Sequence, residues 1–236
     1  MNTSANFHSN TTTNPGHHAQ NKSGSSSKSS RLTLTSTNNL HEFLRTRRSI
    51  RRFKPDPVPD SVIENILTTA SFAPSAHNRQ PWRFAVVTDL SVKTKLADAM
   101  AIEFERDLEK DKLPKAEIQK RTTRSHERII SAPVVIILNV DMSDMDVYPD
   151  KKRNKAEYLM AIQSVANAGM QMLLAAHAEG LGGVWVCSPL FVQETVQSVL
   201  VLPKTWEPQA MFFVGHPMDI PEVRERKPIQ DISIFI

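Results

Sequence analysis

The densest group of reactive side chains in this sequence is a basic run at residues 45–54. It combines the hydroxyl of Ser49 with six cations, which are Arg45, Arg47, Arg48, Arg51, Arg52 and Lys54. Charge runs are most often solvated helix ends, but guanidinium groups that donate paired hydrogen bonds, together with a hydroxyl, match a phosphate monoester. The run therefore predicts a phosphate-binding site.

A second candidate is the polar segment APSAHNRQPW, residues 73–82, which directly precedes a predicted strand. Ser75, Asn78, Gln80 and Trp82 supply more hydrogen-bonding side chains than an ordinary turn requires. Binding groups concentrate in loops that are held by rigid flanks. We therefore interpret this segment as part of a binding site.

The glycine-rich string EGLGG, residues 179–183, allows two interpretations. Glycine can simply end a helix, or it can let backbone N–H groups approach a flat ligand because no Cβ intervenes. The string follows a predicted helix rather than a strand, so it is not a dinucleotide fingerprint.

No pair of nucleophile and base stands out, and no carboxylate cluster or His-x-x-x-His pattern indicates a metal. The adjacent His17 and His18 have no third ligand nearby in the sequence. Anion-binding arginines without an acid/base set are typical of an enzyme in which a cofactor carries the reaction. The sequence thus predicts a bound cofactor and no metal.

Periodicity and breakers predict an α+β fold, with a central mixed sheet surrounded by helices. The basic run follows a short helix that starts at Leu40, and Ser61 with Glu64 has capping-box spacing at the start of the next helix. We expect helices at 60–72, 158–178 and 191–200, and two more within 91–131 that are separated near Pro114. We expect strands at 82–87, 134–140, 184–187 and 210–214. A polar loop is expected at 141–155 and an extended basic segment at 224–228.

Residues 158–178 carry no formal charge over 21 positions, which is long enough to cross a membrane. However, Gln163, Asn167 and Gln171 recur every fourth residue on one face, and a helix facing lipid would not present such a stripe. We expect a central helix that is buried against its own domain or a second subunit, and no membrane partner.

The charge balance argues against nucleic acid. Residues 1–38 are built of polar side chains and contain no acid, so we expect a disordered tail, followed by one domain at 39–236. Of the 29 basic residues, three lie in the tail, which leaves 26 against 25 acidic residues in the remainder. A nucleic-acid binder would carry a basic excess over the whole domain.

The single cysteine, Cys187, offers no internal disulfide, and the N-terminus lacks a charged region followed by an apolar stretch. These features favour a cytoplasmic location.

Four strings resemble the nitroreductase superfamily in their order and spacing, over residues 41–236. They are RRSIRRF at 47–53, APSAHNRQPWRF at 73–84, AEGLGGVWV at 178–186, and FVGHP followed by RERKP at 224–228. The resemblance implies a homodimer with the long helix at its interface and two FMN molecules, each bound by both chains.

The resemblance also implies a role for each site residue. Arg47, Arg48 and Ser49 would contact the phosphate, the ribityl chain or the ring edge, and Arg51 would face the flavin pyrimidine and stabilise the reduced anion. The partner subunit would contribute Pro74, Ser75, Ala76, Asn78 and Gln80. Gly182 and Gly183 would lie against the flavin ring and offer a backbone donor to its N(5) atom. Arg224 and Arg226 would close on the phosphate.

The activity that the resemblance implies is a ping-pong oxidoreductase, in which NADPH or NADH reduces FMN and a nitro, quinone or related acceptor then takes the electrons. The charged stretch 91–131 is a candidate lid, so the acceptor pocket cannot be copied from relatives. APSAHNRQPW and EGLGGVWV are also similar to the flavin domain attached to the glutamate ligase of deazaflavin biosynthesis. The alternative is therefore an enzyme or a binding module for a deazaflavin cofactor or its precursor.

Overall fold

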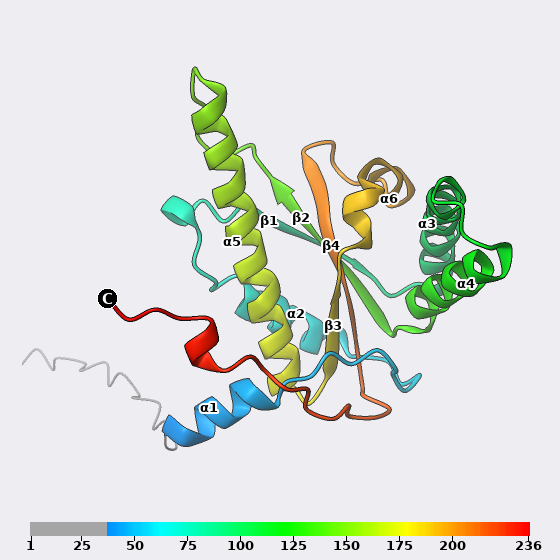
Figure 1. Cartoon of the computed structure of the whole chain (residues 1–236), viewed down its shortest axis with the longest axis horizontal. Coiled ribbons are helices and arrows are strands. Elements are labelled where there is room, and N and C mark those ends of the chain that lie inside the picture. Colours follow the sequence, from blue (N-terminus) through cyan, green and yellow to red (C-terminus); the bar gives the residue numbers. More distant parts are fainter. Residues whose placement is uncertain (1–36) are drawn as a thin grey trace, which may run out of the picture.

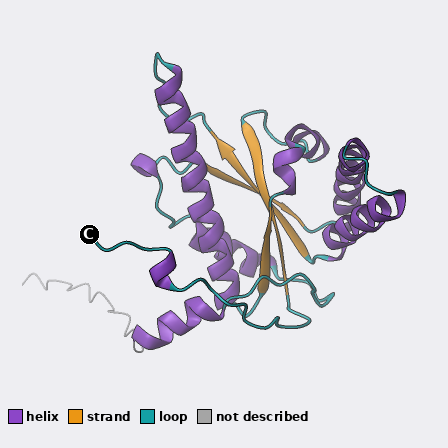
Figure 2. Cartoon of the chain, viewed as in Figure 1, coloured by secondary structure: helices purple, strands orange, loops and turns teal. Residues whose placement is uncertain are grey.

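A four-stranded antiparallel sheet forms the centre of the protein in a computed structural model that describes residues 37–236 (Figure 1). The strand order is β1 (Trp82–Val87), β2 (Val134–Asp141), β4 (Trp206–Gly215) and β3 (Gly182–Val186). Helices cover both faces of the sheet (Figure 2). This arrangement confirms the predicted α+β class.

The core has two halves, one on each side of the sheet. All eight residues of β2 are buried. Ile136 and Leu138 pack into one half, whereas Val135 and Ile137 pack into the other. Successive side chains of a strand point to opposite faces, so a strand covered on both sides appears in the sequence as a continuous apolar run.

One face of the sheet is covered by α2 (Asp60–Ala70) and by the long helix α5 (Lys151–Ala178). Helix α5 starts seven residues before the predicted 158, in part of the stretch that we expected to be a loop. Its first turn is capped by Asp150, whose carboxylate accepts a hydrogen bond from the backbone of Arg153 at 2.9 Å. A Cβ added at Gly169 would lie 2.5 Å from the Trp185 ring, so glycine allows α5 to approach the sheet closely.

The opposite face is covered by α3 (Leu90–Lys110), α4 (Lys115–Ser131) and α6 (Gln193–Val199). The predicted break near Pro114 is confirmed, because this residue stands directly before α4. Lys93 of α3 is buried, and its ammonium group donates a hydrogen bond of 2.7 Å to the carbonyl of Ala132 just beyond α4. A cation at a helix C-terminus is stabilised by the helix dipole.

Helix α5 is the one described helix that is long and apolar enough to cross a membrane, with a mean hydropathy of 1.3. Half of that apolar window is buried inside the protein. Asn167 and Gln171 donate hydrogen bonds to the backbone of Pro74 and Thr69, so part of the predicted polar stripe contacts protein. Helix α5 is therefore a core helix of this fold.

Several details differ from the sequence-based expectations. The four strands of the sheet all pair in the antiparallel direction, whereas we expected a mixed sheet. The isolated bridge between Ser49 and Gly183 is the one parallel pairing among the described residues. The prediction of a capping box at Ser61 is wrong, because Pro59 is the N-cap residue of α2 and no side chain caps this helix.

The ends of the domain also differ. Helix α1 (Thr37–Thr46) starts two residues before the expected domain boundary, and the rest of the predicted tail lies outside the described residues. Residues 224–228 form neither helix nor strand, and the 3₁₀ turn Ile229–Asp231 follows them.

Candidate functional site

The basic run lies beside the start of the edge strand β3 and beside the segment that follows β4. The backbone N–H of Ile50 donates to the carbonyl of Gly183 at 3.1 Å, and that of Lys54 donates to the carbonyl of His216 at 2.9 Å. Ile50 and Phe53 are buried in the core. These two buried side chains fix the segment that carries the arginines.

Two glycines of β3 make this close approach possible. A Cβ at Gly182 would lie 2.6 Å from Ile50, and a Cβ at Gly183 would lie 2.8 Å from Leu173 of α5. Both glycines belong to the strand, and the predicted helix-ending role falls to Gly180, which has a φ of 72°. Packing is therefore a sufficient reason for glycine at 182 and 183, and their contact with a flavin stays a prediction.

A basic cavity of about 280 Å³ brings together the predicted cationic residues from both ends of the chain. Its walls include Arg47, Arg48, Ser49, Arg51, Arg224 and Arg226, together with Pro221 and Glu222. The resemblance implied a role for the two C-terminal arginines, and in the structure they lie on the same cavity as the basic run.

Arg47 is the most informative member of this group. Its Nε and Nη1 atoms are buried and have no hydrogen-bond partner within the part of the chain that the structure describes. Burial, together with the charges of Arg226 and Arg48, lowers the pKa of the Arg47 guanidinium below its ordinary value. A buried charge without a partner is costly, so this position fits an anionic ligand.

Arg48 has a structural partner already. Its guanidinium donates to the carbonyls of Arg45 and Arg47, at 2.6 Å and 2.8 Å, at the end of α1. These bonds satisfy carbonyls that a helix end leaves free, and they place the cation where the helix dipole favours it. The rest of the guanidinium lies at the wall of the cavity.

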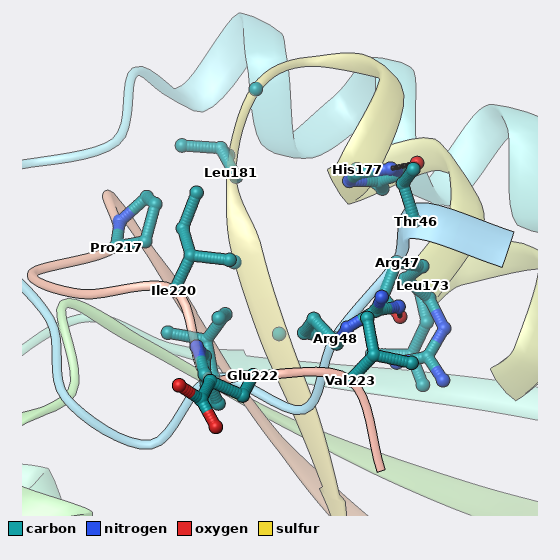
Figure 3. A pocket seen from close by; sticks show the side chains of 15 residues that line it. Thr46, Arg47, Arg48, Leu173, His177, Leu181, Pro217, Ile220, Glu222 and Val223 are labelled. Carbon is teal, nitrogen blue, oxygen red and sulfur yellow. Dashed lines mark hydrogen bonds between the residues drawn. The ribbon is translucent and has the colours of Figure 1, made fainter. Parts of the chain in front are cut away.

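A second cavity of about 470 Å³ adjoins the first and shares Arg47 and Arg48 with it. Figure 3 shows it between β3, residues 46–48 and the C-terminal segment. Its other walls are mainly apolar and include Ile50, Leu173, Leu181, Ile220 and Val223. An apolar cavity next to a cluster of guanidinium groups suits a ligand with a phosphate at one end.

The sequence did not indicate several residues of this cavity. Thr46, His177, Ile220, Glu222 and Val223 lie on its wall, although no motif pointed to them. They come from three distant parts of the chain, and only the fold brings them together.

His177 joins α5 to α1 beside this cavity (Figure 3). Its Nε2 lies 3.1 Å from the Thr46 hydroxyl, and its ring stacks on Phe43 with 4.8 Å between centroids. Burial and the nearby charge of Arg47 lower the pKa of His177 below its ordinary value of 6.5. Both effects favour the neutral imidazole.

We expect this neutral histidine to make the protein less stable in acid. Because the folded state disfavours the protonated imidazole, the unfolded state binds more protons, and the stabilisation present above pH 6.5 is lost as the pH falls. Urea unfolding at a series of pH values, for the wild type and for His177→Gln, measures this contribution. The slope between about pH 7 and pH 5 should be smaller in the variant, and identical slopes would contradict the assignment.

The second predicted segment is a strained loop. His77, Asn78 and Gln80 have positive φ angles of 51°, 54° and 50°, a region that costs free energy for residues other than glycine. Hydrogen bonds hold this conformation: the backbone N–H of Ala76 donates to Ser164 of α5, and that of Gln80 donates to Ser75, both at 3.1 Å. The side chains of Asn78 and Gln80 are exposed, and the Gln80 amide donates to the carbonyl of Asn78 at 3.3 Å.

The two predicted groups do not meet within one chain. Among the cavities of the described residues, none that contains the arginines also contains Pro74, Ser75, Ala76, Asn78 or Gln80. These cavities therefore do not combine the two groups into one site within one chain.

A metal site is not found in the described part of the chain, where no group of three or more metal-binding side chains comes together. The arrangement offers anion binding and an apolar slot.

Comparison with known proteins gives the family. A model of the nitroreductase family matches residues 44–216. The Bacillus subtilis protein YfhC, described as an NAD(P)H nitroreductase, is 28% identical over 192 residues, which cover 81% of this chain and 91% of that protein. An iodotyrosine deiodinase of Haliscomenobacter hydrossis is 30% identical over 202 residues, which cover 82% of this chain and 87% of that protein.

Solved structures agree with these relatives. A Desulfovibrio desulfuricans protein, described as a nitroreductase and solved in complex with FMN, superposes with a TM-score of 0.65 and 26% identity, over 85% of this chain and 98% of that one. The family model spans most of the described domain, and the fold agrees with it. The chain therefore belongs to the nitroreductase family.

Proposed function

We propose that this protein is an FMN-dependent oxidoreductase that uses NADPH or NADH to reduce a nitro, quinone or related small acceptor. The observation that carries the proposal is the half-buried guanidinium of Arg47, whose buried Nε and Nη1 atoms have no partner among the described residues, on a cavity that it shares with Arg224 and Arg226. Family membership and the FMN complex of one relative support the same cofactor.

The described residues fit FMN in charge and in shape. The phosphate would be held by Arg47, Arg224 and Arg226, because three cations converge there on a small cavity. Ser49 adds a hydroxyl on the same wall, and the adjoining apolar cavity gives room for an uncharged part of the ligand. Arg51 would place positive charge beside the ring and so favour its reduced anionic form.

When bound, FMN supplies two-electron chemistry, in which the nicotinamide donor and the acceptor use the site in turn. The protein holds the phosphate, shapes the site and sets its charge, and no described side chain has to act as a nucleophile.

The decisive test is a spectrum of the purified protein followed by a titration. We expect a yellow protein, or a colourless one that takes up added FMN, whose visible absorbance bleaches anaerobically on addition of NADPH or NADH and returns on addition of an acceptor. A protein that binds no FMN would refute the proposal, and one that binds FMN without bleaching would be a flavin-binding module.

A homodimer with shared sites is part of the proposal. Exposed apolar side chains gather on α1, α5 and the C-terminal segment, which lie on the same side of the sheet in Figure 1. They are Leu40, Leu44, Leu159, Met170, Ile232, Ile234 and Phe235. An exposed apolar face of this kind is typical of a subunit interface, and a partner would bring its own loop 74–80 to the arginines.

Mixed dimers test the shared site. Arg47→Met removes the phosphate contact, and Asn78→Gly removes the loop amide while keeping a residue that accepts a φ of 54°. Each variant alone should lose both FMN sites of its dimer. When the two variants are coexpressed with different affinity tags, the mixed dimer should regain one intact site, and its FMN content should rise toward one per dimer. If the mixed dimer regains no FMN, both residues belong to a site within one chain.

A different acceptor class has one specific observation in its favour. The relative from Haliscomenobacter hydrossis is an iodotyrosine deiodinase, so a halogenated phenol is a candidate acceptor for this chain as well. Turnover of iodotyrosine compared with turnover of a nitroaromatic would decide between the two. Action on a deazaflavin stays a prediction from the sequence.

A cytoplasmic location is also proposed. Cys187 is a free, exposed thiol, which a reducing compartment would preserve.

A further inference from the structure

Helix α4 brings additional positive charge to the basic run. Two of its basic side chains have acidic partners: Arg121 pairs with Glu117 at 2.7 Å, and His126 lies 2.8 Å from Asp98. Arg124 and Arg128 have no such partner in the described residues, and neither has Arg51. Arg124 and Arg128 are one helical turn apart, so they lie on one face of α4.

Packing places the C-terminal end of α4, which carries Arg128, beside the basic run. Ile129 of α4 belongs to the same buried cluster as Ile50 and Phe53, the two residues that anchor the run. A second contact between the end of α4 and the run passes through Gly215. A Cβ built at Gly215 would lie 2.6 Å from Pro133, just after α4, and 3.2 Å from Phe53 of the run. In Figure 1 the segment after α1 runs toward the end of α4.

The charges of Arg124 and Arg51 act on Arg128. Arg128 is half-buried, and its pKa is lowered by burial first, then by the charges of Arg124 and Arg51. Like charges that lie one turn apart on a helix destabilise it, and a third cation adds to that cost. The cost is removed when an anion binds among them.

We propose that Arg124 and Arg128, together with Arg51, form a second anion-binding site, which takes a phosphate or carboxylate group of the substrate. Arg51 also lies on the wall of the basic cavity, so the second site borders the proposed flavin site without using Arg47 or Arg224. The identity of the substrates rests on the proposed function, whereas the presence of an anion site does not.

Two sources could supply the anion. The electron donor carries phosphates, and NADPH has one more phosphate than NADH; an acidic acceptor would carry a carboxylate. Both offer the oxygen anion that paired guanidinium groups recognise.

The first experiment needs no flavin. Inorganic pyrophosphate is titrated calorimetrically into the Arg47→Met protein and into the same protein with Arg124→Gln and Arg128→Gln added. We expect the added changes to weaken pyrophosphate binding by roughly tenfold or more, since each lost charge-assisted hydrogen bond is worth about one order of magnitude. Arg121→Gln is the matched control on the same helix, because Arg121 has its own carboxylate partner. Equal affinities with and without Arg124 and Arg128 would overturn the proposal.

The second experiment identifies the source in the flavin-loaded enzyme. It compares kcat/KM of the wild type and of the Arg124→Gln, Arg128→Gln variant for matched charged and uncharged substrates. The donors are NADPH, NADH and dihydronicotinamide riboside, and the acceptors are 4-nitrobenzoate and 4-nitrobenzyl alcohol. A loss confined to the phosphate-bearing donors assigns the site to the donor, and a loss confined to 4-nitrobenzoate assigns it to the acceptor.

Two outcomes of the second experiment count against the proposal. An equal loss for charged and uncharged substrates would indicate that the arginines only support α4, and no loss at all would remove any role for them with substrates. A protein that binds no FMN would refute the proposed function, while the pyrophosphate titration would still decide whether the anion site exists.

Discussion

Arg47→Met should abolish tight FMN binding while leaving the flavin-free protein as stable as the wild type or more so. The methionine keeps an apolar stem of similar length but removes a half-buried guanidinium that lies near Arg226 and Arg48. Loss of one partner of a buried charge pair costs about 2–5 kcal/mol of binding free energy, which corresponds to roughly 30-fold to several thousand-fold in Kd. Without a ligand, the same substitution only removes repulsion between like charges.

Fluorescence titration with FMN measures the change in Kd, and thermal unfolding with and without FMN separates the two effects. The wild type should gain Tm on adding FMN, and the variant should not. Arg52→Met is the matched control, since Arg52 belongs to the same run but forms an exposed ion pair with Asp219 at 3.1 Å. If both variants bind FMN alike, the assignment of Arg47 to the phosphate is wrong.

Gly182→Ala is expected to have the second large effect, because it acts on the backbone of the basic run. The new Cβ would lie 2.6 Å from Cγ1 and 2.7 Å from Cβ of Ile50, and the latter atom cannot rotate away. Ile50 has to shift, and with it the backbone that joins Arg48 to Arg51. We expect a loss of about 1–3 kcal/mol in the free energy of unfolding, as for overpacked cores, together with weaker FMN binding.

Gly180→Ala is the control for this substitution. Nothing lies within 4 Å of a Cβ at Gly180, but its φ of 72° makes alanine unfavourable by about 1–2 kcal/mol. Both variants should therefore be less stable in urea, and only Gly182→Ala should lose FMN. Adding Ile50→Ala to Gly182→Ala relieves the clash and should restore part of the FMN binding. If Gly182→Ala alone leaves the FMN affinity unchanged, the close approach of the run to β3 is not needed for FMN binding.

The sequence predicted most elements of the fold because their patterns are local. Strand β2 is a single apolar run, and Pro114 marks the break between α3 and α4. The start of α5 was missed because its first two turns are charged and exposed, so they show no apolar periodicity, and their helical state depends on the Asp150 cap. Local pattern also misled at Ser61, where the spacing of a capping box occurs without its hydrogen bonds.

The site could be predicted only where its residues belong to motifs. The basic run and the pair Arg224 and Arg226 are recognisable in the sequence, and the fold brings them to one cavity. Thr46 and His177 are 131 positions apart, and no sequence pattern predicts their contact. The strain in the loop at 77–80 is likewise invisible in the sequence, because His, Asn and Gln occur in many ordinary turns.

The unpaired guanidinium of Arg47 has a consequence for the protein inside a cell. A chain that has folded without its ligand carries a buried positive charge near two others, so a larger fraction of its molecules is unfolded at any moment. Unfolded molecules are removed by proteolysis, and a difference of 1–2 kcal/mol can change abundance several-fold. The steady-state level of this protein should therefore follow the riboflavin supply, and vitamin starvation should shorten its half-life without any change in its synthesis.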